Sequence, residues 1–309
     1  MVGLNAPYEN LPQSVRVVEV APRDGWQSLL EFIPTASKIE LVEELAGCGF
    51  AEIEVTSFVN PRAIPQLQDA AAVLAGVKPR PGLVRSALVP NRRGLEAALA
   101  TSVDKLVFFI SASDTHNRKN LGCPQAETLS EIAAMSRQVG SEKAMRVSVS
   151  NVFGCPFEGE IGYDAVVGLV ARLVELGLSE ITLCDTLGVA VPDQVYLYAA
   201  GLKEEFPEVD FGLHLHDSCG RALACVMAGL QAGIDRYDTA AGGLGGCPFA
   251  PGAAGNLATE DLLSCLERMG IATGIDSRRL LAAARRQAGM VKSQLSRMLA
   301  FSDGYHCDQ

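Results

Sequence analysis

Short apolar segments alternate along this chain with longer segments of helical period. The short segments are rich in Val, Ile and Leu and are bounded by turn-forming residues, which is typical of buried strands. They span 15–21, 51–56, 82–88, 103–110, 145–150, 179–184, 209–215 and 234–240. The longer segments repeat apolar residues every three to four positions, which predicts helices near 35–48, 65–76, 91–101, 124–139, 162–177, 192–205, 219–232 and 259–269.

Eight strands, each followed by a helix, favour a closed (β/α)₈ TIM barrel of the α/β class. An open doubly wound sheet is the alternative fold, but no GxGxxG motif follows the first strand. Residues 276–299 predict an additional helical segment at the C-terminus, and 300–309 read as an irregular tail. We therefore expect one TIM-barrel domain over 1–309, with the barrel itself spanning about 15–270.

The amino-acid composition limits which kinds of binding partner and which cellular compartment we expect. The chain has 309 residues, 48% of them hydrophobic, and a net charge of −10 without a Lys/Arg run, which excludes a nucleic-acid partner. An apolar run of about 18 residues is absent, so we expect no membrane span. The N-terminus has no signal-peptide or transit-peptide pattern. Nine scattered cysteines fit a reducing, cytoplasmic setting.

Two opposite charges, Arg23 and Asp24, follow directly after the first apolar strand, in VVEVAPRDGWQ. In a TIM barrel the chemistry gathers at the C-terminal ends of the strands, which is where this pair lies. A surface ion pair without function is the alternative interpretation of the two charges taken alone.

A His-x-His pair ends the seventh strand, in LHLHD. Residues two apart in a strand point to one face, so the imidazoles of His214 and His216 can converge on one ion, whereas the alternative is a core histidine. The first and seventh strands are close in an eight-stranded ring, so Asp24 can add a carboxylate, and Asn256 can add a neutral oxygen. Such a ligand set suits Mg²⁺, Mn²⁺ or Zn²⁺.

Three further residues lie near the expected barrel mouth. Glu54 is an acid inside an apolar strand, which is costly unless it is paired, and Arg23 one strand away is its natural partner. Asp185 after the sixth strand is either an active-site acid or a loop or helix cap. The Gly-rich segment 241–247 suggests a lid that carries the thiol of Cys247 to the mouth, and a buried, inert thiol is the alternative.

Seven segments, in this order, together resemble the 3-hydroxy-3-methylglutaryl-CoA (HMG-CoA) lyase family, which belongs to a wider group of metal-dependent barrel lyases and synthases. They are VEVAPRDGWQ, EVTSFVNP, SASDTHNRKN, FGCPFEG, DTLGVAVP, HLHD and GLGGCPFAPGAAGNLATED. The resemblance covers about 15–270. It implies cleavage of HMG-CoA to acetyl-CoA and acetoacetate with Mg²⁺ or Mn²⁺, as in leucine degradation and ketone-body formation.

The resemblance also implies roles for individual residues. The positions that match the family's metal ligands are Asp24, His214, His216 and Asn256. Those that match its other active-site residues are Arg23, Glu54, Asp185 and Cys247. For the cleavage of HMG-CoA we expect Arg23, held by Glu54, to stabilise the negative charge on the thioester oxygen. We expect Cys247 to protonate the enolate of acetyl-CoA. Either His214 or Asp24 accepts the proton of the substrate hydroxyl.

The chain departs from the family's usual motifs at several positions. Where GLQNE is usual, this chain has Trp26, Ser28 and Leu29, and Asn151 follows the fifth strand. We expect these residues to line the barrel mouth, which leaves open another substrate, such as citramalyl-CoA or a longer 3-hydroxyglutaryl-CoA. A Claisen-type synthase is a further alternative, but it usually carries HxHND and a long C-terminal extension. An inactive, metal-binding scaffold is the non-enzymatic alternative.

Binding of coenzyme A requires basic groups for its phosphates. Arg118 and Lys119 are the candidates, whereas Arg92 and Arg93 fit a solvated helix face. By analogy with barrels of this kind we expect a homodimer. Cys307, in the expected tail, is given no function.

Overall fold

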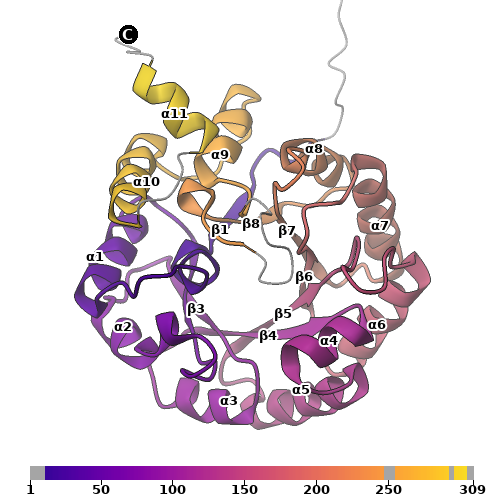
Figure 1. The fold of residues 1–309 in the computed structure, drawn as a ribbon. Coiled ribbons are helices and arrows are strands. Elements are labelled where there is room, and N and C mark those ends of the chain that lie inside the picture. The colour runs from indigo at the N-terminus through magenta and orange to yellow at the C-terminus, as the bar shows by residue number, and fades with distance from the viewer. Residues whose placement is uncertain (1–10, 247–254, 292–295, 305–309) are drawn as a thin grey trace, which may run out of the picture.

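The computed structural model describes residues 11–246, 255–291 and 296–304 of the chain. Eight parallel strands follow one another around a closed barrel, and β1 pairs with β8 to close it (Figure 1). The predicted TIM barrel is therefore confirmed. The strands are β1 Arg16–Glu19, β2 Glu52–Ser57, β3 Val84–Leu88, β4 Lys105–Ser111, β5 Ala144–Ser150, β6 Glu180–Asp185, β7 Asp210–Leu215 and β8 Arg236–Thr239.

Helices surround this barrel, and Figure 1 views the assembly along the barrel axis. They are α1 Thr35–Ala46, α2 Ala70–Gly76, α3 Arg92–Leu99, α4 Asp114–Leu121, α5 Gln125–Val139, α6 Tyr163–Glu175, α7 Pro192–Glu205, α8 Ala222–Gln231, α9 Thr259–Arg268, α10 Ser277–Val291 and α11 Arg297–Gly304. Three short turns complete the described elements: η1 Ala21–Gly25, η2 Pro65–Leu67 and η3 Ala241–Gly243. Buried Val, Leu and Ile side chains from strands and helices form one continuous apolar core.

The first strand is shorter than the predicted 15–21 because the chain turns after Glu19. The carbonyl oxygen of Val20 accepts the N–H groups of Arg23 and Asp24, at 3.1 and 2.7 Å, and this closes the turn η1. Pro22 lies within the turn, where its missing N–H costs no hydrogen bond. The turn carries Arg23 and Asp24 over the C-terminal end of the barrel instead of along the strand.

The C-terminal region forms additional helices, as the helical segment predicted at 276–299 indicated. Helix α10 ends at Val291 and a separate helix, α11, starts at Arg297, so the prediction of an irregular tail is wrong for 300–304. Figure 1 shows α9, α10 and α11 together outside β1 and β8. Cys307 lies outside the described residues.

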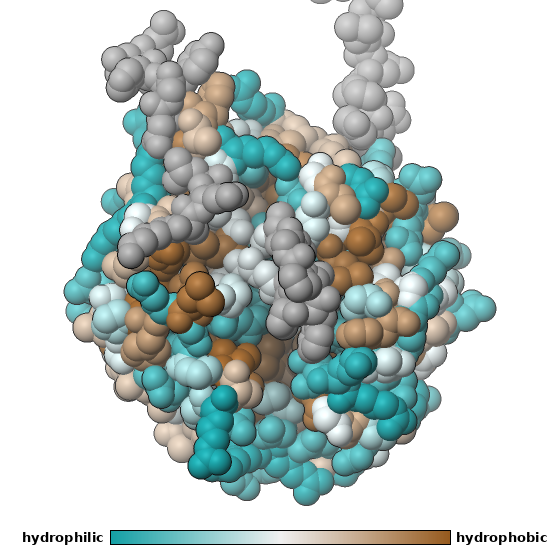
Figure 2. All heavy atoms as spheres, in the orientation of Figure 1, coloured by the Kyte–Doolittle hydropathy of each residue, from teal (hydrophilic) through white to brown (hydrophobic). Residues whose placement is uncertain are grey.

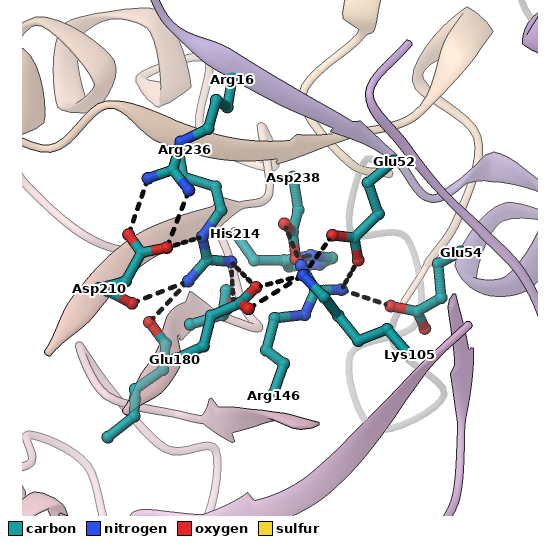
Figure 3. Close-up of polar contacts among 12 residues, drawn as sticks. Arg16, Glu52, Glu54, Lys105, Arg146, Glu180, Asp210, His214, Arg236 and Asp238 are labelled. Carbon is teal, nitrogen blue, oxygen red and sulfur yellow. Dashed lines mark hydrogen bonds and ion pairs between the residues drawn. The ribbon is translucent and has the colours of Figure 1, made fainter. Parts of the chain in front are cut away.

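The barrel interior contains charged side chains as well as apolar ones. Figure 3 shows them converging from several strands, joined by hydrogen bonds and ion pairs. The buried members are Glu52, Glu54, Arg146, His214, Arg236 and Asp238. Because a buried charge is stable only when it is paired, these residues form a network and not a set of independent groups.

The surface of the molecule carries both hydrophilic and hydrophobic residues (Figure 2). Figure 2 shows one face, with hydrophilic residues predominating around its periphery and hydrophobic ones closer to its centre. Among the residues that the structure describes, no helix is both long and apolar enough to cross a membrane.

Candidate metal centre and active site

Asp24, His214 and His216 meet at the C-terminal end of the barrel. The Oδ2 atom of Asp24 lies 3.9 Å from the Nε2 atom of each histidine, and the two Nε2 atoms are 3.3 Å apart. Ligands bound about 2.1 Å from one ion at octahedral or tetrahedral angles are separated by about 3.0–3.4 Å. The distance between the two histidines lies in this range, and Asp24 would have to move slightly closer to both of them to share an ion. All three side chains are buried and offer one ligand atom each. The group is therefore a candidate site for a divalent cation.

Asn256 lies against this group. Its backbone forms an isolated antiparallel bridge with His216, and its Nδ2 atom donates to Asp24 Oδ2 at 2.7 Å and to the Leu244 carbonyl at 2.8 Å. Its Oδ1 atom is buried and has no hydrogen-bond partner among the described residues. A buried carbonyl oxygen without a partner is costly, and a cation beside Asp24 would satisfy it. The donor set therefore fits a metal ion.

The protonation states also suit metal binding. Burial opposes ionisation of Asp24, but the charge of Arg23 and the two histidines outweigh it and lower the pKa of Asp24 to about 2. Burial, together with the neighbouring His214, lowers the pKa of His216 to about 4. Near neutral pH the site therefore presents a carboxylate and a neutral His216 imidazole, the forms that bind metals.

Surrounding groups hold Asp24, His214 and Asn256 in place. Asp238 Oδ2 lies 3.5 Å from His214 Nδ1, which directs the other ring nitrogen toward the site, and Gln27 Nε2 donates to Asp24 Oδ1 at 2.8 Å. Gly245 packs so closely that a Cβ atom there would lie 2.4 Å from Asn256 Nδ2, and its φ is +122°. Only glycine fits that position.

Arg23 lies between the candidate cation site and Glu54. Its guanidinium forms ion pairs with both Asp24 and Glu54, and all three side chains are buried. The predicted pairing of Arg23 with Glu54 is present. The pKa of Arg23 is raised, because the two carboxylates outweigh burial, so a fixed positive charge stands beside the metal ligands.

Two residues that the sequence analysis missed complete this arrangement, namely Arg146 on β5 and Asp238 on β8. Arg146 contacts Glu54 and Asp238 at 2.9 and 3.1 Å, as Figure 3 shows. Each of the two is a charged residue inside a predicted apolar strand. This signal was available in the sequence, but only Glu54 was identified from it.

Asp185 occupies a different position from the metal ligands. Its carboxylate accepts the N–H groups of Val189 and Ala190, at 3.1 and 2.9 Å, which agrees with the loop-capping interpretation. Burial raises its pKa although these hydrogen bonds oppose the shift. A catalytic role for Asp185 stays a prediction.

The remaining site predictions concern Cys247, Arg118 and Lys119. Cys247 lies outside the described residues. Arg118 and Lys119 are exposed on α4, where Arg118 pairs with Asp114 at 2.7 Å and Lys119 Nζ lies 4.9 Å from the centre of the Phe157 ring. Binding of coenzyme A by these two residues stays a prediction.

The residues that depart from the family's motifs were expected to line the barrel mouth, but not all of them do. Trp26 is 1% exposed, belongs to the apolar core and donates to Gln287 Oε1 on α10 at 3.0 Å, so this expectation is wrong for it. Asn151 is buried and adopts a φ of +58°, a conformation that asparagine tolerates better than most residues. Its side chain donates to the Gly154 carbonyl at 3.2 Å and so shapes the turn after β5.

Comparisons with known proteins show the family to which the chain belongs. The HMGL-like family model matches residues 14–286. Hydroxymethylglutaryl-CoA lyase YngG of Bacillus subtilis is 43% identical over 282 residues, which are 90% of this chain and 93% of that protein. The crystal structure of the B. subtilis HMG-CoA lyase superposes with a TM-score of 0.92 at 41% identity, covering 96% of this chain and all of that one. An Acinetobacter baumannii HMG-CoA lyase in complex with coenzyme A and 3-methylmalate gives 0.91 at 37% identity, covering 96% and 97%. The chain therefore belongs to the HMG-CoA lyase family.

Proposed function

We propose that this protein cleaves HMG-CoA to acetyl-CoA and acetoacetate. The observation that carries the proposal is the convergence of Asp24, His214 and His216 within one buried group, with Arg23 ion-paired to Asp24 at its side. This arrangement places a candidate cation site next to a permanent positive charge. Cleavage of a 3-hydroxyacyl thioester requires both, because an alkoxide and then an enolate must be stabilised.

The four oxygen and nitrogen ligands would come from Asp24, His214, His216 and Asn256, and we propose Mg²⁺ or Mn²⁺ as the ion. When bound, such an ion supplies Lewis-acid polarisation of the substrate oxygens. The surrounding residues keep the ligands oriented: Asp238 faces His214, and Gln27 donates to Asp24. The donor set of carboxylate, amide and imidazole suits either ion better than a thiolate-preferring metal.

The reaction begins when the C3 hydroxyl loses its proton and the C2–C3 bond breaks. This leaves a ketone in acetoacetate and the enolate of acetyl-CoA. Asp24 is a weak proton acceptor because its pKa is lowered to about 2, which favours His214 as the base. Arg23, held by the carboxylate of Glu54, is placed to stabilise the negative charge that grows on the thioester oxygen.

Cys247 is our candidate for the acid that delivers a proton to C2 of the enolate. If so, Cys247→Ala should lower kcat by about 10²- to 10⁴-fold, the usual contribution of a positioned acid, while the Kd for Mn²⁺ stays unchanged. An equal loss of turnover and of metal affinity would instead assign Cys247 a structural role. Measuring both quantities on the same preparation separates the two outcomes.

The acyl substrate can be tested by competition among thioesters. HMG-CoA, citramalyl-CoA and a longer 3-hydroxyglutaryl-CoA should be assayed for release of the keto product with Mg²⁺, with Mn²⁺ and with chelator. We expect HMG-CoA to give the highest kcat/KM, because the buried position of Trp26 leaves this departure from the family's motif away from the mouth. Turnover that persists in chelator, or a higher kcat/KM for another thioester, would contradict the proposal.

Binding of coenzyme A, assembly and compartment complete the proposal. We propose that Arg118 and Lys119 on α4 contact the phosphates of coenzyme A; since both are exposed, replacing them with Gln should raise KM and leave kcat nearly unchanged. A homodimer is proposed by analogy alone, and light scattering tests it. The seven cysteines in the described ranges are all free thiols, which supports a reducing, cytoplasmic setting.

A further inference from the structure

Arg146 is a fully enclosed charge in the barrel interior. It lies on β5, its side chain is 0% exposed, and its two terminal nitrogens contact different carboxylates (Figure 3). Nη2 donates to Glu54 Oε2 at 2.9 Å, and Nη1 donates to Asp238 Oδ1 at 3.1 Å. Nη2 also lies 3.6 Å from Glu52 Oε1, which is an ion pair but not a hydrogen bond. Nε has no hydrogen-bond partner within the described part of the chain, so Glu54 and Asp238 accept the hydrogen bonds of this side chain.

Each of these two carboxylates also contacts a residue of the active site. Glu54 forms an ion pair with Arg23, and Asp238 faces the Nδ1 atom of His214 at 3.5 Å. Because Arg23 is in turn paired with Asp24, a continuous chain of charged contacts runs from one candidate metal ligand, Asp24, to another, His214. Arg146 is the central link of this chain.

We propose that Arg146 is a positioning residue that couples the two halves of the active site. By holding Glu54 it fixes Arg23 against the reacting thioester, and by holding Asp238 it fixes the ring of His214 toward the cation. The inference rests on the proposed function for the first half only. The second half concerns metal affinity, which exists without substrate.

Removal of Arg146 would leave Glu54 and Asp238 buried without the cation that they share. Each carboxylate would lose the hydrogen bond that fixes its position, and a rearrangement of either one would release the partner that it holds. A lysine at the same position keeps the charge, but its single ammonium nitrogen must serve two carboxylates that the guanidinium reaches with separate nitrogens. We therefore expect lysine to restore only part of the function.

The chain offers a matched control in Arg236. This arginine is also in the barrel interior and is 2% exposed. It donates to Thr182 Oγ1 at 2.9 Å and to the carbonyls of Ile181 and Asp210, both at 3.1 Å. Within the described residues none of its hydrogen bonds or ion pairs reaches Glu54, Asp238 or a metal ligand, although its positive charge helps to lower the pKa of Asp238. Arg236→Lys keeps that charge and is therefore the stricter control.

The experiment compares Arg146→Lys and Arg146→Met with Arg236→Lys and Arg236→Met in the full-length protein. Three quantities are measured: the Kd for Mn²⁺ without substrate, kcat and KM for HMG-CoA, and the midpoint of urea unfolding. We expect Arg146→Met to raise the Kd for Mn²⁺ about 10- to 100-fold, as for other residues that orient metal ligands. We expect it to lower kcat about 10²-fold or more through the displaced Arg23. Arg146→Lys should lie between this variant and the wild type.

Arg236→Lys, which keeps the charge near Asp238, should leave the Kd for Mn²⁺ and kcat within about threefold of the wild type. Arg236→Met should change both quantities less than Arg146→Met while losing comparable stability. Equal effects of the two arginines, or an unchanged Kd for Mn²⁺ in Arg146→Lys and Arg146→Met, would overturn the proposal. A wild-type protein that binds Mn²⁺ but does not cleave HMG-CoA would refute the proposed function, and the Mn²⁺ measurements would still decide whether Arg146 orients His214.

A double-mutant cycle locates the coupling. If Arg146 acts on the metal site through Asp238, Asp238→Asn should raise the Kd for Mn²⁺ in the wild type and have little further effect in Arg146→Lys. Additive effects of the two substitutions would show that they act separately and would contradict the proposed route. Because Arg146→Lys keeps the charge, the cycle does not depend on the stability of the methionine variant.

Discussion

Glu19, at the end of β1, is a buried carboxylate that has no cationic partner among the residues that the structure describes. Its Oε1 atom accepts the N–H groups of Ala21 and Ala241, both at 2.9 Å, and its Oε2 atom accepts the hydroxyl of Thr259 at 2.8 Å. It therefore ties the turn that carries Asp24 to η3 and to the start of α9. Burial raises its pKa from 4.5 to about 7, although the three hydrogen bonds oppose the shift. Near pH 7 the carboxylate and the neutral acid of Glu19 are therefore both populated.

The raised pKa of Glu19 predicts the direction in which the stability of the fold changes with pH. The folded protein binds the Glu19 proton more tightly than the unfolded chain, so the stabilisation is complete below pH 4.5 and is lost as the pH rises through about 7. Glu19→Gln removes the titration and keeps the geometry, because the amide oxygen can accept both N–H groups and the amide nitrogen can donate to Thr259. Relative to wild type, the variant should gain about 3 kcal/mol between about pH 5 and about pH 8.

Urea unfolding in the presence of chelator measures this difference without interference from metal binding. The exposed ion pair of Arg286 with Glu40 provides the control: Glu40→Gln should shift the unfolding free energy by less than about 1 kcal/mol at both pH values. Parallel pH dependences of wild type and Glu19→Gln would contradict the assignment of a raised pKa to Glu19.

At the scale of elements, α10 lies outside the eight-stranded barrel and yet contacts the segment next to the site. Gln287 on α10 is 1% exposed; its Oε1 atom accepts from Trp26 and its Nε2 atom donates to the Ala241 carbonyl at 2.7 Å. One amide thus connects α10 with the end of η1 and with η3. These contacts link the C-terminal segment to the two turns nearest the candidate metal ligands.

Replacement of Trp26 tests this connection. Trp26→Phe keeps most of the apolar volume but leaves the buried Gln287 Oε1 without its donor, so we expect a loss of about 1–3 kcal/mol in unfolding free energy. Gln287→Met should cost a similar amount, and the double variant less than the sum of the two. Because Trp26 is the only tryptophan in the sequence, its emission in the Gln287→Met variant also reports whether the ring stays buried. Unchanged stability of Trp26→Phe would mean that the hydrogen bond contributes nothing.

The elements that could be predicted from the sequence are those with a regular apolar pattern. All eight strands appear close to their expected positions, because each combines β-branched residues with flanking turns. Helix α4 was missed since DTHNRKNL has no apolar stripe; its signals were Ser113, whose hydroxyl caps it, and Gly122, which ends it with a left-handed conformation. The boundary between α10 and α11 was not predicted, because 276–299 contains no Pro and its one glycine, Gly289, lies inside α10.

The sequence indicated which residues belong to the candidate site, but not all of the residues with which they form ion pairs. The metal group was predictable because strand alternation brings His214 and His216 to one face and barrel closure brings Asp24 beside them. The roles of Arg146 and Asp238 were not, since which charges pair inside a barrel depends on strand stagger and rotamers that no local pattern encodes. Tertiary packing likewise decided that Trp26 faces the core.

At the scale of the whole molecule, the candidate metal centre lies where the barrel closes. Its ligands come from the turn after β1, from the end of β7 and from the segment that precedes α9, so they join residues 24 and 256 of one chain. β7 and β1 both pair with β8. A cation bound there would connect the first and last parts of the barrel, and binding should therefore stabilise the fold as a whole.

The size of this stabilisation follows from the affinity and the concentration of the ion. An ion that binds only the folded protein adds about 2.7 kcal/mol at a concentration of 100 Kd, which for a chain of this length corresponds to a rise in Tm of about 4 °C. We expect Mn²⁺ to produce this shift in a thermal scan and chelator to reverse it. Asp24→Asn and His216→Ala should abolish it, whereas Asp69→Asn, which alters a carboxylate paired with Lys38 outside the candidate metal group, should keep it. If Asp24→Asn retained the full shift, the stabilising ion would bind elsewhere, and the site at the barrel closure would lose its strongest physical support.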